Sequence, residues 1–484
     1  MISNKDTWFH PKQARSPMSI KNLFTSDLKV VNIGLESFAT NIRSAGAEAL
    51  QLDWKPPLID DPGLMRRLGE KSAIIDAANE KALDIVLQGK PLLVGLDIAA
   101  NVIPGMDAKT ILHSGPPVAW PEMCGPTRGA IIGALIYEGL AATPEEAEQL
   151  AASGEISFSP CHEHDTVGPM AGIVSARMPV FIIKNEAYGN QAYCTLNEGL
   201  GKVLRYGAYS DEVLDRLRWM ETTLYPILKK AVEHQGAIDL KSLVAQALHM
   251  GDEVHNRNRA ATSLFYRAIA PAIVRTAETR EDAAKVLEFI NGNDHFFLNL
   301  SMPAAKACLD AAHGIENSSM VTVMARNGTE FGIKLAGTGN KWFTGKAPVP
   351  DALFFPGFTK EDANPDIGDS SITETWGIGG FAIAAAPAIV QFVGGRAQDA
   401  LNYSLEMYEI TIGENNVFQL PALDFRGSPT GIDAIKVVEK NITPFIDTGV
   451  AHKKPGIGQV GAGVLSAPAE PFVKAFNCFL DVLK

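Results

Sequence analysis

The sequence predicts an α/β protein with a Rossmann-like N-terminal layer, a helical middle domain and a mixed α/β C-terminal domain. Its 484 residues exceed the ~250 to 300 at which a single core usually stops growing, so several domains are expected. Strand and helix patterns alternate near the start of the chain, helical periodicity dominates from Asp211 to about Arg280, and mixed patterns return after Asp294. Together these observations favour an α/β fold that is divided by a helical segment.

The N-terminal layer is predicted over residues 28–110. It opens on a βαβ unit, and a longer helix and a third strand then extend a doubly wound arrangement. In order, the predicted elements are a strand at Lys29–Ile33, a helix at Glu36–Ser44, a strand at Ala47–Asp53, a helix at Leu64–Gln88 and a strand at Pro91–Asp97. Residues 1–27 mix charge, proline and serine without a period, and we expect them to form an arm.

Two domains are predicted in the middle of the chain. Residues 111–207 form an α/β domain with loops rich in glycine and proline, an apolar helix at Ala130–Gly139 and a strand at Pro179–Lys184. Residues 208–290 form the helical domain. Its apolar stripe consists of Leu214, Leu217, Leu224, Ile227, Leu228 and Val232.

The C-terminal domain is predicted over residues 291–484. Strands at Ser319–Met324 and Glu330–Leu335 flank the turn Arg326-Asn327-Gly328, and this arrangement predicts a hairpin. Further on, we expect a buried apolar helix at Ala382–Val393 and a closing helix at Pro468–Lys484.

Composition argues against several classes of partner. The chain has 43 basic and 55 acidic residues and a formal charge of -12, which disfavours binding to nucleic acid. No stretch approaches the roughly 20 apolar residues that span a membrane, and the first residues lack the apolar core of a secretory signal. The five cysteines are widely spaced and form no CxxC pair. We therefore expect a cytoplasmic protein that acts on a small molecule.

The run Gly251 to Asn258 is unusually polar for a helical domain, and we predict that it lies on a helix. Carboxylates, a histidine, an arginine and amides can together supply a proton carrier, an anion fork and directional hydrogen bonds. The candidate catalytic residues of this run are Asp252, Glu253, His255, Asn256 and Asn258, and Arg257 is a candidate anion binder. The alternative is a solvated helix face on which Glu253 pairs with Arg257.

A second candidate is the segment Cys161-His162-Glu163-His164-Asp165. Alternate histidines on an extended segment point to one side, so His162 and His164 are predicted to share a ligand or to transfer a proton. A third metal ligand would come from His255 or Asp252. The alternatives are a loop whose imidazoles are hydrogen-bonded and, for Cys161, a buried thiol without a chemical role.

Glycine-rich turns supply the remaining candidates. Arg128 precedes an apolar helix, where backbone N–H groups and the guanidinium can converge on an anion, although the segment can equally be a capped helix start. In the C-terminal half the candidate binding residues are Asn327, Asp369, Glu374, Asp424 and Arg426, and the run Asp366 to Thr375 can alternatively be an acidic capping loop.

Known fingerprints for cofactors and nucleophiles are missing from the sequence. The turn at Asn32 to Glu36 lacks GxGxxG, and the chain contains no GxxxxGK[ST], HExxH or GxSxG motif. We therefore assign no cofactor-binding residue and no metal ligand, and the cofactor stays unknown.

Several unusual strings in series resemble the bacterial YlbE/YahG-like family, whose AllG member is a subunit of the oxamate carbamoyltransferase of allantoin breakdown. The likeness covers nearly the whole chain after about residue 28. It is carried by VVNIGLESFA with DWKPP, GPTRGAIIGALIYEGLA, CHEHDTVGPMAGI, NEGLGKVLRYGAY, GDEVHNRN, RNGTEFGI, DIGDSSITET and DFRGSPTGIDA.

The resemblance implies transfer of a carbamoyl group between phosphate and the amino group of oxamate, by an oligomer that contains FdrA-like and other subunits. Such chemistry needs an anion fork, a donor at the carbamoyl oxygen and a group that manages the amide proton. We assign these roles to Arg128 or Arg257, to Asn256 or Asn258, and to His255 or His164. The chain lacks the Ser-Thr-Arg-Thr phosphate signature of ordinary carbamoyltransferases, so their site cannot be carried over.

Two other classes of function stay open at the level of sequence. The chain can be a scaffold or regulatory subunit of an FdrA-like complex that performs no catalysis itself. It can also be a metal-dependent amide or ureide hydrolase that uses His162, His164 and His255.

Overall fold

The computed structural model describes residues 29–52, 55–389 and 395–483. Contacts divide the chain into two compact units, Met1–Pro56 and Pro57–Lys484, which we describe separately. The arm predicted for residues 1–27 lies outside the described residues.

The first unit contains the predicted βαβ arrangement. Strand β1 (Lys29–Ile33) and strand β2 (Glu48–Leu52) pair in parallel, and helix α2 (Glu36–Ser44) connects them. Among its described residues only Ala39 is buried. This small unit therefore has almost no core of its own in the described part.

The second unit is a mixed α/β structure, as predicted, and one of its two four-stranded sheets, which we call the curved sheet, has the strand order β7-β6-β3-β8. Strand β3 forms where the sequence predicted a strand, but it pairs antiparallel with β6 and β8. The prediction that this strand extends the N-terminal parallel layer is therefore wrong. The four strands are β3 (Pro91–Ile98), β6 (Pro179–Asn185), β7 (Gln191–Thr195) and β8 (Ile238–Asp239).

A second sheet has the order β11-β10-β9-β13 and contains the predicted hairpin. Strands β9 and β10 pair antiparallel around the Asn-Gly turn, with Arg326 opposite Phe331. This pairing confirms the predicted hairpin. The sequence could predict it because the Asn-Gly signal is local to the turn. The strands of this sheet are β9 (Val321–Asn327), β10 (Glu330–Leu335), β11 (Phe343–Lys346) and β13 (Ile367–Gly368).

Three smaller sheets complete the strands of the second unit. One has the order β12-β17-β16, one is the hairpin β14-β15, and one is the parallel pair β4-β5. Their bounds are β4 (Thr110–His113), β5 (Ser157–Pro160), β12 (Asp351–Phe354), β14 (Thr411–Leu420), β15 (Arg426–Ile432), β16 (Phe445–Ala451) and β17 (Gln459–Ser466).

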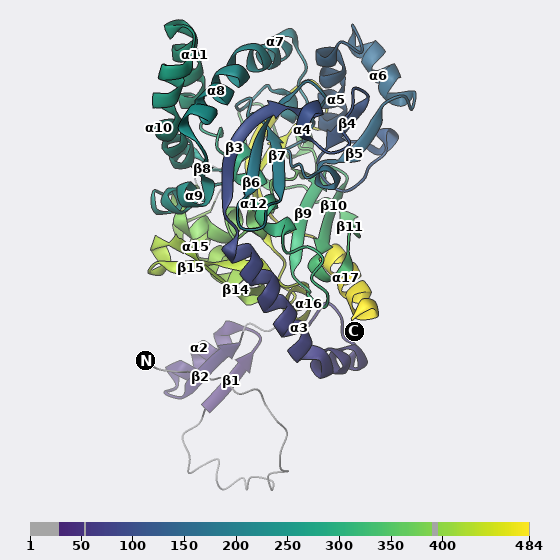
Figure 1. The fold of residues 1–484 in the computed structure, drawn as a ribbon. Coiled ribbons are helices and arrows are strands. Elements are labelled where there is room, and N and C mark those ends of the chain that lie inside the picture. The colour runs from purple at the N-terminus through teal and green to yellow at the C-terminus, as the bar shows by residue number, and fades with distance from the viewer. Residues whose placement is uncertain (1–28, 53–54, 390–394, 484) are drawn as a thin grey trace, which may run out of the picture. The chain divides into compact units, whose positions relative to one another are not determined.

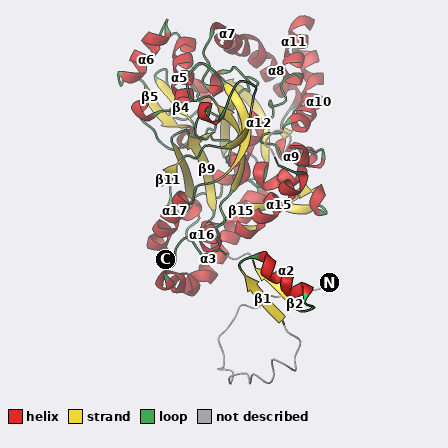
Figure 2. Ribbon diagram, turned by 180° about the vertical axis from the view of Figure 1, so that it is seen from behind, coloured by secondary structure: helices red, strands yellow, loops and turns green. Residues whose placement is uncertain are grey.

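Helices surround and cross these sheets (Figure 1). Their bounds are α3 (Pro62–Gln88), α4 (Ala99–Val102), α5 (Gly125–Glu138), α6 (Pro144–Ala152), α7 (Asp211–Trp219), α8 (Tyr225–Gln235), α9 (Leu240–His249), α10 (Arg259–Thr276), α11 (Arg280–Asn291), α12 (Leu298–Asp310), α13 (Ile372–Thr375), α15 (Ala397–Met407), α16 (Ala434–Lys440) and α17 (Ala469–Val482). Seen from behind, α8, α10 and α11 form a group beside the curved sheet (Figure 2).

Most helix predictions hold, but the one at Ala382–Val393 does not. The predicted helices near Leu64 and at the C-terminus correspond to α3 and α17. Helix α5 starts before its predicted first residue, because Pro126 occupies the first turn, where its missing N–H costs no hydrogen bond. The buried helix predicted from Ala382 is instead a short 3-10 helix, η7 (Gly379–Ala385), with non-helical backbone at Ala382; residues 390–394 lie outside the described part.

Helix α12 lies at the centre of the second unit. It packs against β6 and β7 and against α13 and β9, and it is buried from Leu298 to Leu309. Lys306 is the one charged residue in this buried stretch, with 2% of its surface exposed. Helix α12 thus brings a cation into the core. In the described residues no helix is both long and apolar enough to cross a membrane.

Candidate functional site

The polar run Gly251 to Asn258 forms a folded loop between α9 and α10, so the prediction that it lies on a helix is wrong. Gly251 has a φ of 90° and Val254 a φ of 66°, and both values leave the helical region. A β-branched residue rarely adopts positive φ, so the conformation at Val254 is strained and must be held by its surroundings. The Val254 N–H donates to the Arg257 carbonyl and closes a tight turn.

The two carboxylates of this loop explain why the helix breaks. Glu253 accepts the backbone N–H groups of Asn256 and Arg257, and Asp252 accepts the Ala261 N–H in the first turn of α10. Acidic side chains that bond to backbone in this way compete with helical hydrogen bonds. Asp252 and Glu253, which the sequence analysis proposed as site residues, therefore determine the conformation of the loop.

His255 lies between two buried carboxylates from distant parts of the chain. Its Nδ1 is 2.7 Å from Oε1 of Glu374, which lies in α13, and 3.0 Å from Oδ1 of Asp447, which lies in β16. Exposure of these three side chains is 3% or less. Glu374 also accepts the Gly380 N–H, so its position is fixed from two sides.

Gly379 lets the backbone approach this cluster. A Cβ at this position would lie 2.3 Å from Oε1 of Glu374, and the φ of Gly379 is 61°. The Gly379 N–H donates to the Glu253 carbonyl at 2.7 Å, which joins the loop to the segment that follows α13. We call Glu253, His255, Glu374 and Asp447 the central cluster.

Charge coupling shifts the protonation of the central cluster. Burial lowers the pKa of His255, but the charges of Glu374 and Asp447 outweigh this effect and raise it to about 10. Burial and the neighbouring Asp447 raise the pKa of Glu253 well above its usual range. For Asp447, the charge of His255 outweighs burial and lowers the pKa. The shifts favour a protonated His255 and a protonated Glu253 beside an ionised Asp447.

Arg326 borders the central cluster and is fully buried in β9. Its guanidinium pairs with Asp366 at 2.5 Å and donates to the Thr448 hydroxyl at 3.2 Å. It also donates to the Gly368 carbonyl at 2.9 Å. Since Thr448 follows Asp447 and Gly368 precedes Asp369 in the chain, Arg326 connects the central cluster to a second one.

The second cluster consists of His162, Lys306 and Asp369. Nε2 of His162 lies 3.6 Å from Oδ1 of Asp369, and its Nδ1 lies 3.5 Å from Nζ of Lys306. Burial and the charge of Lys306 lower the pKa of His162 well below its usual value, so the imidazole is neutral. Burial raises the pKa of Asp369 to about 7, although the N–H groups of Gly115 and Gly168 donate to it.

The two histidines of the Cys161 to His164 segment do not point to one side, because the segment is a 3-10 helix, η2, and not extended. Whereas His162 faces Asp369, both ring nitrogens of His164 bond elsewhere, to the Pro104 carbonyl at 2.6 Å and the Ser159 hydroxyl at 2.8 Å. The prediction of a shared ligand rested on the wrong periodicity. Burial raises the pKa of the Cys161 thiol well above its usual value.

The other predicted residues of the loop and of α5 have these contacts. Nε of Arg257 lies 3.3 Å from Oδ1 of Asp252, and Asn258 donates to the His255 carbonyl. Nδ2 of Asn256 is buried and lacks a hydrogen-bond partner among the described residues. Arg128 donates to the carbonyls of Trp120 and Pro121 and lies over the Trp120 ring.

The C-terminal candidates separate into buried and exposed residues. Asn327 is buried, and its side chain donates to the Pro116 carbonyl. Arg426 is exposed and pairs with Glu414 inside the β14–β15 hairpin at 2.7 Å. Asp424 is exposed in the turn that precedes β15, with a φ of 52°. The structure thus brings Glu374 and Asp369 to the two clusters and places Asp424 and Arg426 on the hairpin.

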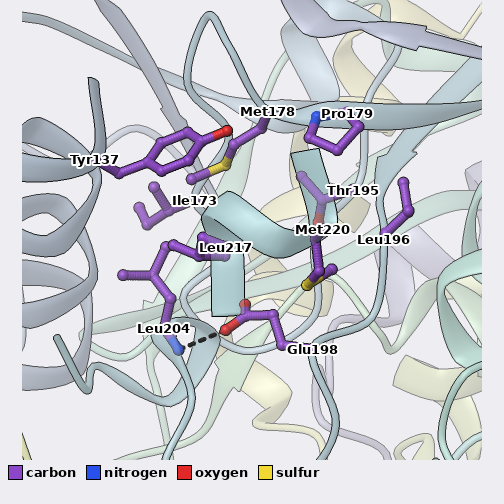
Figure 3. Close-up of a pocket in the computed structure, with 10 residues that line it drawn as sticks. All are labelled: Tyr137, Ile173, Met178, Pro179, Thr195, Leu196, Glu198, Leu204, Leu217 and Met220. Atoms are coloured by element: carbon purple, nitrogen blue, oxygen red, sulfur yellow. Dashed lines mark hydrogen bonds between the residues drawn. The ribbon is translucent and has the colours of Figure 1, made fainter. Parts of the chain in front are cut away.

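A small pocket lies apart from the predicted site residues, between α5, β7 and α7 (Figure 3). Its lining is mostly apolar, with the phenol of Tyr137 and the carboxylate of Glu198 facing it. Glu198 is 8% exposed and accepts the N–H groups of Leu204 and Arg205. Because this carboxylate already accepts two backbone hydrogen bonds, we assign it a structural role in fixing the turn at Leu204.

Sequence reasoning missed Asp447 and Lys306. Each has a visible signal, since a charged residue interrupts an apolar strand or helix: Asp447 stands in FIDTGVA and Lys306 in LNLSMPAAKACLD. Buried charges in such positions are paired or bind a ligand. What the sequence could not show is that Asp447 meets the loop at His255 and that Lys306 meets His162.

The fold and the two buried clusters define a mixed α/β protein with a charged site in its core. Comparison with known proteins gives the family. A model of the family "Oxamate carbamoyltransferase subunit AllG" matches residues 156–370. The chain is 48% identical to the uncharacterized protein YahG of Escherichia coli K12, over 94% of this chain and 98% of that protein.

It is also 45% identical to the oxamate carbamoyltransferase subunit AllG of the same organism, over 84% of this chain and 97% of that protein. A crystal structure of a conserved protein of unknown function from Enterococcus faecalis V583 has a TM-score of 0.84 and 52% identity, and the match covers 85% of this chain and 99% of that one. The chain therefore belongs to the YahG/AllG-like family, as the sequence motifs predicted.

Proposed function

We propose that this chain is a subunit of a carbamoyltransferase that moves a carbamoyl group between oxamate and phosphate in purine (allantoin) catabolism. The observation that carries the proposal is the 45% identity to the AllG subunit over most of both chains. In the degradative direction, a phosphate oxygen attacks the carbamoyl carbon of oxalurate, the bond to the oxamate nitrogen breaks, and that nitrogen takes a proton. The products are carbamoyl phosphate and oxamate.

The loop at Gly251 to Asn258 offers groups for this reaction. The buried Nδ2 of Asn256, which has no partner among the described residues, suits the carbamoyl oxygen as an oriented donor. Asn258 fits this role less well, because its amide donates to a backbone carbonyl. An unpaired buried donor is costly unless a ligand uses it, which supports Asn256.

Candidate anion binders and proton carriers can be ranked by their contacts. Arg257 lies on the same loop and its side chain is 30% exposed, whereas Arg128 already donates to two carbonyls; we therefore favour Arg257 for phosphate or the oxamate carboxylate. For the proton we favour His255 over His164, since both nitrogens of His164 are bonded. Asp252 and Glu253 then hold the loop.

The name of the AllG relative includes the word subunit, which supports an oligomer with other chains. We propose that these partners include an FdrA-like subunit and that the complex acts on its small-molecule substrate in the cytoplasm. Catalysis then requires the assembled complex. A scaffold role for this chain is the competing possibility, and the assay below separates the two.

The test is formation of carbamoyl phosphate from oxalurate and phosphate, measured for the chain alone and with its partner subunits. In the assembled complex we expect His255→Ala to reduce the rate by about 10²- to 10⁴-fold and Asn256→Ala by about 10²- to 10³-fold. The control is His249→Ala, an exposed histidine at the end of α9, which should leave the rate unchanged.

Each other outcome has a defined meaning. Full activity of both site variants in the complex would show that the chain is a scaffold. Consumption of oxalurate without phosphate would indicate hydrolysis in place of transfer.

A further inference from the structure

We propose that the central cluster binds one divalent metal ion through Nδ1 of His255, Oε1 of Glu374 and Oδ1 of Asp447. The three ligand atoms lie within 4.8 Å of one another. The side chains come from the loop before α10, from α13 and from β16, so three separate elements converge on one point. Such convergence of one imidazole and two carboxylates is typical of sites for zinc, manganese or iron.

A second observation comes from Asp447 itself. Its side chain is fully buried, and apart from the ion pair between Oδ1 and Nδ1 of His255 at 3.0 Å, neither carboxylate oxygen has a hydrogen-bond partner among the described residues. Oδ1 lies near Nδ1 of His255, so this carboxylate is aimed into the cluster. A buried carboxylate normally has several donors, because leaving it unpaired costs free energy. A bound cation would satisfy both oxygens.

The charge around the cluster points the same way. Carboxylates of Glu253, Glu374, Asp447 and Asp366 gather in the core beside a single fully buried guanidinium, that of Arg326. These four carboxyl groups outnumber the guanidinium of Arg326 and the imidazole of His255. A divalent ion reduces this excess, and buried charge in proteins is generally paired or coordinated to a metal.

The surroundings hold the ligands in place before any ion binds. Glu374 accepts the Gly380 N–H at 2.9 Å and the Thr373 hydroxyl at 3.0 Å. Asn258 donates to the backbone of His255. Hydrogen bonds of this outer shell orient ligands and raise metal affinity.

The metal alternative that the sequence suggested used His162, His164 and His255, and of these only His255 belongs to the site proposed here. It does not rest on the proposed function, but it changes one assignment within it. With an ion in the cluster, His255 contributes to the reaction by holding the ion, and proton transfer falls to another group.

The experiment is a binding measurement on the full chain, first dialysed against EDTA and then titrated with MnCl₂ while the signal of free Mn²⁺ is followed by electron paramagnetic resonance. We expect about one Mn²⁺ per chain. Glu374→Gln and Asp447→Asn should each weaken binding at least about tenfold. The matched control is Asp433→Asn, a buried aspartate that caps α16 and bonds to Ser319, which should bind Mn²⁺ like the unmodified chain.

The inference is overturned if the unmodified chain binds neither Mn²⁺ nor Zn²⁺ at stoichiometric levels, or if both cluster variants bind as the unmodified chain does. A second measurement covers variants that fail to fold. In crystals of the unmodified chain soaked with MnCl₂, an anomalous peak between His255, Glu374 and Asp447 supports the site, and a peak only elsewhere, or none, contradicts it. Neither measurement depends on carbamoyl transfer, so failure here leaves the proposed function standing.

Discussion

The two compact units distribute polarity in opposite ways. The described part of the first unit exposes apolar side chains: Val31, Ile33 and Leu50 are each more than 50% exposed, and only Ala39 is buried. The second unit buries charged side chains, among them Arg326, Lys306 and Asp447, at 2% or less. The free energy of unfolding of the second unit should therefore depend on how its buried charges are paired. Substitutions of exposed residues in the first unit should change that free energy little.

The largest expected effect comes from breaking the buried pair of Arg326 and Asp366. We expect Arg326→Met to lower the free energy of unfolding by about 3 to 5 kcal/mol, because Asp366 is left as an unpaired charge in the core. Urea denaturation followed by circular dichroism measures the change. A loss below about 1 kcal/mol would contradict the view that this pair is essential to the core.

A smaller effect is expected from the protonation of Asp369. Its pKa is about 7 in the folded protein against 3.8 for the free side chain. Between these values the folded protein binds the proton more tightly than the unfolded chain, so the free energy of unfolding falls as pH rises from about 4 to 7 and levels off above 7.

Asp369→Asn removes this titration, so the difference in unfolding free energy between the unmodified chain and the variant should change by a few kcal/mol across that window. Denaturant titrations at several pH values measure it. Equal pH profiles for the two proteins would show that Asp369 is ionised throughout.

A modest effect is expected at the exposed counterpart of the buried pair. Arg426→Met removes the ion pair with Glu414, in which the arginine side chain is 44% exposed. Because solvent screens such pairs, we expect a loss of about 0.2 to 1 kcal/mol in the same urea experiment. A loss as large as that of Arg326→Met would erase the contrast between surface and core.

The smallest effect is expected in the first unit. Ile33→Ser combined with Leu50→Ser changes two exposed side chains on adjacent strands of one sheet. We expect the free energy of unfolding of the second unit to change by less than about 0.5 kcal/mol, as for most surface substitutions. A larger change, read from the main urea transition, would mean that the second unit depends on this face for its stability.

Sequence predicted those features whose signals are local. The β9–β10 hairpin follows from the Asn327-Gly328 turn, and α3 and α17 follow from helical periodicity and terminal residues. The polar density at Glu253 and His255 singled out a loop whose side chains contact Glu374 and Asp447 in the core. Its conformation was mispredicted because carboxylates bonded to backbone N–H groups, and a positive φ at Val254, override helical spacing.

The rest of the site depends on contacts between residues far apart in the chain. Asp447 meets His255 only because β16 lies beside the loop, and nothing in the string FIDTGVA identifies its partner. Strand β3 is another example. Its pattern predicts a strand, but its antiparallel pairing with β6 and β8 is decided by tertiary packing.

The burial of α12 has a consequence for hydrogen exchange. Its residues from Leu298 to Leu309 are exposed by no more than a few per cent in the folded state. Its neighbours are β6, β7, β9, which carries Arg326, and α13, which carries Glu374. Its amide protons can therefore exchange with deuterium only when those neighbours separate, which requires opening of the whole unit. The slowest amides among the described residues should therefore lie in α12. The exchange rate of the Lys306 amide then reports the free energy of unfolding of the second unit.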